Sequence, residues 1–245
     1  MNKLVDFFYP PRCQLCGSRH HLLYGGQLCA ACAADFRLNK TPCQVCAVPM
    51  NVSKGGKSPQ SSTCGQCTKT SPVYDYCWSP FVYSQPLEWM IQQLKFNQKL
   101  NFAPLLSNLM AEKICENVSQ HLFENNKPDV IIPMPLHNRR LKQRGFNQSH
   151  LLIKPIAKIL ELPIDLNSCK RVRDTEHQTG KNARQRQQNI KNAFAFDNRR
   201  SYQHVTIFDD VVTTGSSVSE LSKILKTGGV KRVDVWCLAR AEKIN

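Results

Sequence analysis

The stretch Val205-Thr-Ile-Phe-Asp-Asp-Val-Val-Thr-Thr-Gly-Ser-Ser-Val-Ser219 decides the fold of this chain. Residues 205–208 are β-branched or aromatic, which is typical of a buried strand in a parallel sheet. Apolar residues recur at helical spacing from Val218 to Leu225, so the polar residues in between are expected to form a loop after the strand. Open α/β sheets bind ligands at the carboxyl ends of their strands. The stretch therefore predicts an α/β fold with a ligand site in this loop.

The side chains of the loop suit a phosphate and a ribose. Residues 213–217 can direct backbone N–H groups and hydroxyls at one anion, at the start of a helix. Asp209 and Asp210 precede them, and carboxylates can accept hydrogen bonds from adjacent ribose hydroxyls and help to hold Mg²⁺. Phosphate and diol together indicate a phosphoribosyl group. The alternative is an ordinary strand, turn and capped helix with incidental acids.

This stretch resembles the phosphoribosyl-diphosphate (PRPP) binding motif of type I phosphoribosyltransferases, in which two acids are followed by Thr-Thr-Gly-(Ser/Thr)-(Ser/Thr). In those enzymes the loop after the first core strand holds the diphosphate. Here residues 129–132 form a predicted strand that leads into a proline-constrained, cationic loop at residues 133–140. The resemblance implies that PRPP binds with Mg²⁺ at Asp209, Asp210, Val211, Thr213, Thr214, Gly215, Ser216, Ser217, Pro135, Leu136 and Arg139.

The cysteine pattern predicts metal sites. Eight of the twelve cysteines lie before residue 68, in four Cys-x-x-Cys pairs: Cys13, Cys16, Cys29, Cys32, Cys43, Cys46, Cys64 and Cys67. Tetrahedral Zn²⁺ needs two such pairs, so we expect two structural Zn²⁺. Successive pairing keeps the loops short, but an interleaved arrangement uses the same ligands. An iron–sulfur site and redox dithiols are alternatives to zinc.

Charge favours a polyanionic partner. The chain carries 33 Lys and Arg against 18 Asp and Glu. Residues 137–200 hold 15 of those cations and 5 of the acids, close to the predicted phosphate site. We expect this segment to contact the backbone of single-stranded DNA, whereas the alternative is an ordinary solvated basic surface. The candidate contacts are Arg140, Lys142, Arg144, Lys181 and Arg186.

The cysteine-rich residues 1–71 are predicted to form a small double zinc-ribbon domain, and residues 72–245 the α/β domain. Asp6 interrupts the first apolar run and Pro10 ends it, so no secretion signal is expected. No stretch approaches the roughly 18 apolar residues of a membrane helix. We therefore expect a cytoplasmic protein, in which paired cysteines hold metal rather than form disulfides.

Two segments within the basic residues 137–200 carry further predictions. A helix is expected from Arg144 to about Glu161, with Ile159 facing inward. Residues 173–189 are nearly devoid of apolar side chains, and we expect a mobile loop over the ligand site, with disorder as the alternative. Arg184 and Arg186 on this loop are candidates for neutralising a departing diphosphate, beside Asp209 and Asp210 as the other candidate catalytic residues.

Several motifs together resemble the ComF/GntX family of competence and DNA-utilisation proteins. They are the paired Cys-x-x-Cys ribbons, Leu94-Lys-Phe96, Pro133-x-Pro135, Arg144-Gly-Phe-Asn-Gln148, a pattern of Arg173-x4-Gln178 and Arg184-x4-Asn189 before Ala193-Phe194, and the PRPP motif. The resemblance implies a mostly parallel, phosphoribosyltransferase-like sheet with flanking helices behind a double zinc ribbon. It also implies a cytosolic role in handling DNA taken up during transformation, with a possible partner in the DNA-uptake machinery.

Three functions stay open at this point. The first is a nucleic-acid-handling protein with a PRPP-binding domain and a single-stranded DNA surface. The second is a phosphoribosyltransferase of nucleotide metabolism, in which Mg²⁺ and the diphosphate loop stabilise the leaving group. The third is a PRPP sensor without turnover. The sequence specifies no acceptor base.

Overall fold

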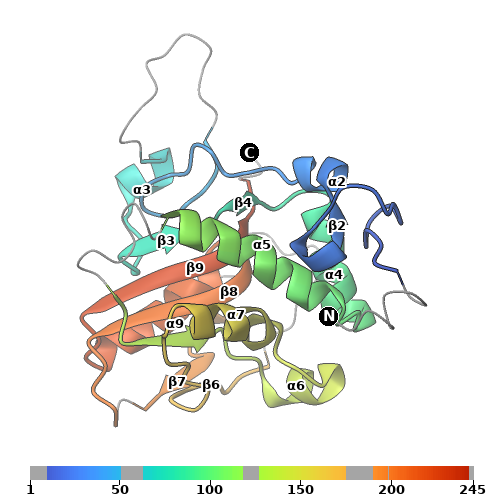
Figure 1. Ribbon diagram of the computed structural model, residues 1–245. Coiled ribbons are helices and arrows are strands. Elements are labelled where there is room, and N and C mark those ends of the chain that lie inside the picture. Colours follow the sequence, from blue (N-terminus) through green and yellow to red (C-terminus); the bar gives the residue numbers. More distant parts are fainter. Residues whose placement is uncertain (1–9, 51–62, 118–126, 175–189, 198, 243–245) are drawn as a thin grey trace.

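A computed structural model describes residues 10–50, 63–117, 127–174, 190–197 and 199–242. Its centre is a sheet in which every strand pair is parallel, in the order β3-β9-β8-β5, with β4 also paired to β9 (Figure 1). The strands are β3 (Tyr76–Trp78), β4 (Phe81–Val82), β5 (Val130–Pro133), β8 (His204–Val212) and β9 (Arg232–Arg240). The strand predicted at residues 205–208 is therefore part of β8, an inner strand of a parallel sheet.

Helices cover both faces of the sheet. Successive side chains of a strand point to opposite faces, so Phe208 packs in one apolar cluster and Ile207 in another. The first cluster contains buried residues of α4 (Leu87–Asn97), α5 (Phe102–Asn117) and α7 (Gln148–Ile159). The second contains Val218, Leu221 and Leu225 of α9 (Ser216–Thr227). This three-layer arrangement confirms the predicted α/β class.

The cysteine-rich segment lies along one end of the sheet (Figure 1). Its elements are β1 (Leu22–Leu23), the 3-10 helix η1 (Tyr24–Gly26), β2 (Leu28–Cys29), α2 (Ala30–Ala34) and α3 (Gly65–Lys69). Cys13 and Cys29 belong to the apolar cluster of α4 and α5, whereas Cys43 and Cys67 belong to that of α9. Each cysteine group thus packs against a different face, and a domain boundary at residues 71 and 72 stays a prediction.

The segment after β5 differs from the prediction. The helix expected from Arg144 to about Glu161 is present as α7, but its predicted start is wrong, because α6 (Asn138–Arg144) ends at Gly145, whose φ is +80°, and α7 begins only at Gln148. Ile159 is exposed instead of inward. A short antiparallel pair, β6 (Cys169–Arg171) and β7 (Phe194–Phe196), lies beyond α7. Among the described residues, no helix is both long and apolar enough to cross a membrane.

Candidate functional site

A cavity of about 300 Å³ opens at the carboxyl ends of β5 and β8. All of residues 209–218 line it, and so do Leu136 from the loop after β5 and Arg140 from α6. Side chains of α4 and of the α6–α7 segment complete the wall: Lys95, Phe96, Arg144 and Gln148. The structure therefore brings the acids, the small-hydroxyl loop and several cations to one place, as the sequence predicted for the first two.

The loop at residues 213–215 turns directly into α9. Gly215 is the N-cap with a φ of +80°, a left-handed conformation that favours glycine. The hydroxyls of Thr214 and Ser216 are 2.8 Å apart and hydrogen-bond each other. Because the first turn of α9 and these hydroxyls line the cavity, the N-terminal end of the helix can bind a phosphate there.

Asp210 is the more buried of the two acids, with 1% of its surface exposed. Its Oδ2 forms an ion pair with Lys95 of α4, and its Oδ1 accepts a hydrogen bond of 3.3 Å from Gln148 Nε2. Burial raises the pKa of Asp210, but the charge and hydrogen bond of Lys95 outweigh it, so the net shift is downward. Asp210 is therefore an ionised, firmly held carboxylate.

Asp209 lies in different surroundings. It is partly buried, and its Oδ1 accepts hydrogen bonds from Ser149 Oγ at 3.0 Å and from the N–H of Asp210 at 2.9 Å. Burial raises the pKa of Asp209 well above its usual range, and the neighbouring charge of Asp210 raises it further. A bound cation or hydroxyl donor would therefore favour the ionised form of Asp209.

The Arg144-to-Gln148 stretch connects these parts. Asn147 caps α7 by accepting from the N–H of Ser149 at 2.9 Å, and its amide donates to the carbonyl oxygen of Met134 at 3.0 Å in the loop after β5. Arg144 donates to Gln148, which in turn contacts Asp210. The resemblance singled out this stretch, and its contacts give a physical reason: it fixes one loop relative to the acids of the other.

The predicted diphosphate residues divide between two cavities. Leu136 lines both the first cavity and a second one, whereas Pro135 lines only the second. The side chain of Arg139 is 70% exposed and lies 3.5 Å from Asp174, outside the lining of the first cavity, where Arg140 takes the corresponding place. Lys142 lines neither cavity. The expected sites at Lys181, Arg184 and Arg186 lie outside the described residues.

Sequence reasoning missed several residues that line the first cavity or hold its acids, and four of them are polar or charged groups beside the site. Lys95 and Gln148 contact Asp210, Ser149 contacts Asp209, and Arg171 lines the wall from β6. Lys95 belongs to Leu94-Lys-Phe96 and Gln148 ends the Arg144 stretch, so both lay in motifs that the sequence had marked. Nothing in the sequence marked Ser149 or Arg171.

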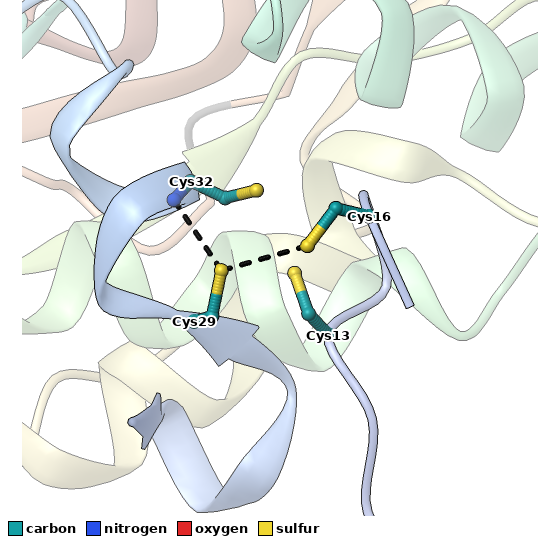
Figure 2. Close-up of side chains that lie close together, drawn as sticks. All are labelled: Cys13, Cys16, Cys29 and Cys32. Atoms are coloured by element: carbon teal, nitrogen blue, oxygen red, sulfur yellow. Dashed lines mark hydrogen bonds between the residues drawn. The ribbon is translucent and has the colours of Figure 1, made fainter. Parts of the chain in front are cut away.

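The first four cysteines converge on one point (Figure 2). Cys13 and Cys16 come from a turn, Cys29 ends β2 and Cys32 lies in α2, and their sulfur atoms all lie within 4.8 Å of one another. The N–H of Cys32 donates to Cys29 Sγ at 3.5 Å. Burial raises the pKa of Cys13, but backbone hydrogen bonds lower it more, to about 6. This geometry suits a tetrahedral Zn²⁺.

The second group has the same form. The sulfur atoms of Cys43, Cys46, Cys64 and Cys67 also lie within 4.8 Å of one another, and all four residues are buried. The N–H of Cys64 donates to Cys43 Sγ at 3.2 Å, and backbone hydrogen bonds lower the pKa of Cys64 to about 6 against the effect of burial. Successive pairing is thus confirmed and the interleaved alternative is excluded.

The chain is similar to known proteins in both its cysteine-rich part and its α/β part. Residues 4–68 match the family described as "Double zinc ribbon domain". The chain is 36% identical to the DNA utilization protein YhgH of Escherichia coli O157:H7, over 94% of this chain and 97% of that protein. It is 33% identical to Competence protein F of Haemophilus influenzae, over 96% and 99% of the two chains. The similarity spans the ribbons and the sheet together.

Proposed function

Because the chain belongs to the ComF/YhgH family of competence and DNA-utilization proteins, we propose that it is a cytoplasmic nucleic-acid-handling protein whose α/β domain binds PRPP. A possible partner is a component of the DNA-uptake machinery. The observation that carries the PRPP assignment is the single cavity in which the two acids, the loop at residues 213–217 and the cations Arg140 and Arg144 meet.

Each part of PRPP has a matching group in this cavity. The 5-phosphate accepts hydrogen bonds from the N–H groups and hydroxyls of residues 213–217. The ribose hydroxyls donate to the carboxylates of Asp209 and Asp210. The diphosphate lies against the loop after β5, and Arg140 of the following helix α6 supplies positive charge. Mg²⁺, when it arrives with the diphosphate, would be held by Asp209, whose carboxylate is the hard oxygen ligand that this ion prefers.

Turnover is the second candidate for the same site. In a phosphoribosyl transfer, the bond between C1 and the diphosphate breaks while an acceptor nitrogen bonds to C1, and Arg140 would balance the charge that develops on the departing diphosphate. The cations Arg140 and Arg144 line the same cavity and supply the positive charge that this reaction needs. A sensor without turnover would use the same cations to bind the diphosphate, so the release of diphosphate is what distinguishes the two.

The test is a titration of zinc-loaded protein with PRPP, followed by an assay for released diphosphate. We expect one PRPP per chain, with tighter binding in Mg²⁺ than in chelator. Diphosphate release that requires a nucleobase or amine supports the transferase, whereas binding without release supports the sensor. Absence of PRPP binding at millimolar concentration would reject both.

Single-stranded DNA is the proposed macromolecular ligand, and α6 is its proposed contact. Four of the seven residues of α6 are Lys or Arg, and none is acidic. A second cavity of about 850 Å³ lies beside α6 and α7. Its lining includes the cations Lys154 and Lys170 next to the exposed apolar side chains Leu141, Leu166 and Val172. Cations suit phosphates and exposed apolar surface suits unstacked bases, so the two together favour single strands.

Phe36 and Trp78 are buried in the core, so they are not available to stack on the bases of a bound strand. Fluorescence anisotropy with a labelled oligonucleotide tests the DNA proposal. If about four phosphates are neutralised, the slope of log affinity against log salt should be about −3, from ~0.7 counterions per contact. Lys142→Gln and Lys154→Gln should each make the slope shallower, while Lys223→Gln on α9 should not. Binding that ignores salt would reject the proposal.

A further inference from the structure

Phe96 is an exposed aromatic side chain at the wall of the first cavity. It is 72% exposed, the largest exposed fraction among the large hydrophobic residues that the structure describes. It lines the cavity together with the phosphate loop and both acids. Of the other large apolar side chains on its helix, Leu87, Met90, Ile91 and Leu94 are buried in the core, whereas Trp89 is 37% exposed and packs edge-on against Phe102. Packing of α4 therefore does not account for an aromatic ring at this position.

A closed circuit of contacts joins Phe96 to the acids. Lys95, its neighbour in the chain, forms the ion pair with Asp210. On the other side, Asp210 accepts from Gln148, and Gln148 accepts from Arg144. The guanidinium carbon of Arg144 lies 5.9 Å from the centroid of the Phe96 ring, within the range of a cation–π contact. The ring is thus placed by the same residues that hold Asp210.

From this arrangement we propose that Phe96 and Arg144 form a base-binding subsite, and that the cavity accepts a ribonucleoside 5′-monophosphate. The inference rests on the proposed phosphoribosyl site and names its ligand class more closely. The phosphate occupies the loop at residues 213–217, the ribose hydroxyls donate to the acids, and the base stacks on the Phe96 ring. Arg144 supports the ring from one side, while most of the ring surface is open to the ligand.

Stacking explains why an aromatic residue is needed here rather than a hydrogen-bonding one. Every base has an aromatic face, so a phenylalanine accepts purines and pyrimidines with little selection among them. Selection falls instead on the sugar, because Asp209 and Asp210 can accept hydrogen bonds only from a ribose that carries both hydroxyls. The subsite therefore predicts a preference for ribonucleotides over 2′-deoxyribonucleotides.

Calorimetric titration of the full zinc-loaded chain with three probes tests the inference. The probes are ribose 5-phosphate, adenosine 5′-monophosphate and its 2′-deoxy analogue. We expect adenosine monophosphate to bind about tenfold or more tightly than ribose 5-phosphate, the gain of one stacked base. Phe96→Ala should remove that gain and leave ribose 5-phosphate affinity unchanged, while Phe96→Tyr should retain it. Leu100→Ala, an exposed apolar residue outside the cavity lining, is the matched control.

The possible results distinguish a failure of the base subsite from a failure of the phosphoribosyl site. If ribose 5-phosphate binds but adenosine monophosphate binds no more tightly, or if its advantage survives Phe96→Ala, the base subsite is refuted and the phosphoribosyl site stands. If neither probe binds, the phosphoribosyl site itself is refuted and the subsite with it. Equal affinity for the ribose and 2′-deoxyribose nucleotides would overturn the assigned ribose selection. Because Phe96 is exposed, its replacement is not expected to unfold the chain.

Discussion

The guanidinium of Arg240 donates a hydrogen bond of 2.9 Å to the carbonyl oxygen of Cys46. The same buried side chain donates to the carbonyl oxygens of Val212 at 2.8 Å and of Thr213, at the start of the proposed phosphate loop. One arginine at the end of β9 therefore ties the second cysteine group to that loop. The ribbon is thus part of the support of the ligand site rather than a separate appendage.

Replacing Arg240 tests this connection. Arg240→Met removes the donor to the carbonyl oxygens of Cys46 and Thr213, while that of Val212 keeps the N–H of Ala241; an unsatisfied buried carbonyl costs about 1–3 kcal/mol, so we expect a clear fall in the free energy of unfolding. PRPP affinity should fall as well, because the loop loses its support. Urea denaturation and calorimetry measure the two effects. Arg37→Met is the control: Arg37 pairs with Glu242 at an exposed surface, so its loss should cost less than about 1 kcal/mol. Equal effects of the two substitutions would refute the support role.

Metal content gives the next prediction. The two groups of four cysteines should bind two Zn²⁺ per chain, and Cys16→Ser or Cys67→Ser should each remove one. Because the second group contacts Arg240 through Cys46, Cys67→Ser should weaken PRPP binding more than Cys16→Ser. Elemental analysis and titration of the same samples check both statements. One metal per chain, or iron in place of zinc, would contradict the assignment.

Asp209 is expected to lower the stability of the free protein although it contributes to ligand binding. The pKa of Asp209 is raised in the folded state, so its ionisation costs stability that grows as pH rises from the unfolded value of about 3.9 to the raised folded value. Asp209→Asn should therefore stabilise the free protein at neutral pH, on the order of 1 kcal/mol, and the gain should vanish near pH 4. Melting curves across this range measure it. A gain that does not change with pH would mean that charge is not its cause.

Substitutions of Gly215 test whether backbone strain, rather than steric crowding, destabilises the phosphate loop. Its φ of +80° strains any residue with a side chain, whereas an added Cβ would meet only ordinary contacts, the nearest at 3.8 Å from the Tyr74 hydroxyl. Gly215→Ala should therefore cost roughly 1–2 kcal/mol of stability and loosen the phosphate loop, and Gly215→Val should cost more because β-branched residues tolerate this region least. Thermal unfolding and PRPP titration of both variants check the order. A harmless Gly215→Val would show that the loop relaxes.

The phosphate loop could be predicted from sequence because its functional residues are contiguous in the chain. Strand, acids, small hydroxyls and helix follow one another between Val205 and Leu225, so local patterns sufficed. The cysteine sites were predictable for a similar reason, since the spacing of each pair defines two ligands of one metal.

The supports of the site were not predictable, because they come from distant parts of the chain. Lys95 lies on α4 and Arg240 at the end of β9, and neither has a local pattern that indicates its partner. A buried arginine at a strand end looks in sequence like an ordinary terminal cation. The choice between Arg139 and Arg140 also depended on the geometry of α6, which the sequence had suggested to be a loop.

The most direct test of the account is a calorimetric titration of PRPP with Mg²⁺ into the zinc-loaded chain and its Asp209→Asn/Asp210→Asn variant. The control is Glu116→Gln/Asp197→Asn, which removes two acids outside the cavity lining. We predict one PRPP per wild-type chain, similar affinity in the control, and loss of binding in the Asp209/Asp210 variant, because amides cannot supply the charge that the ribose and the metal require. Unchanged PRPP affinity in the folded Asp209/Asp210 variant would contradict the site.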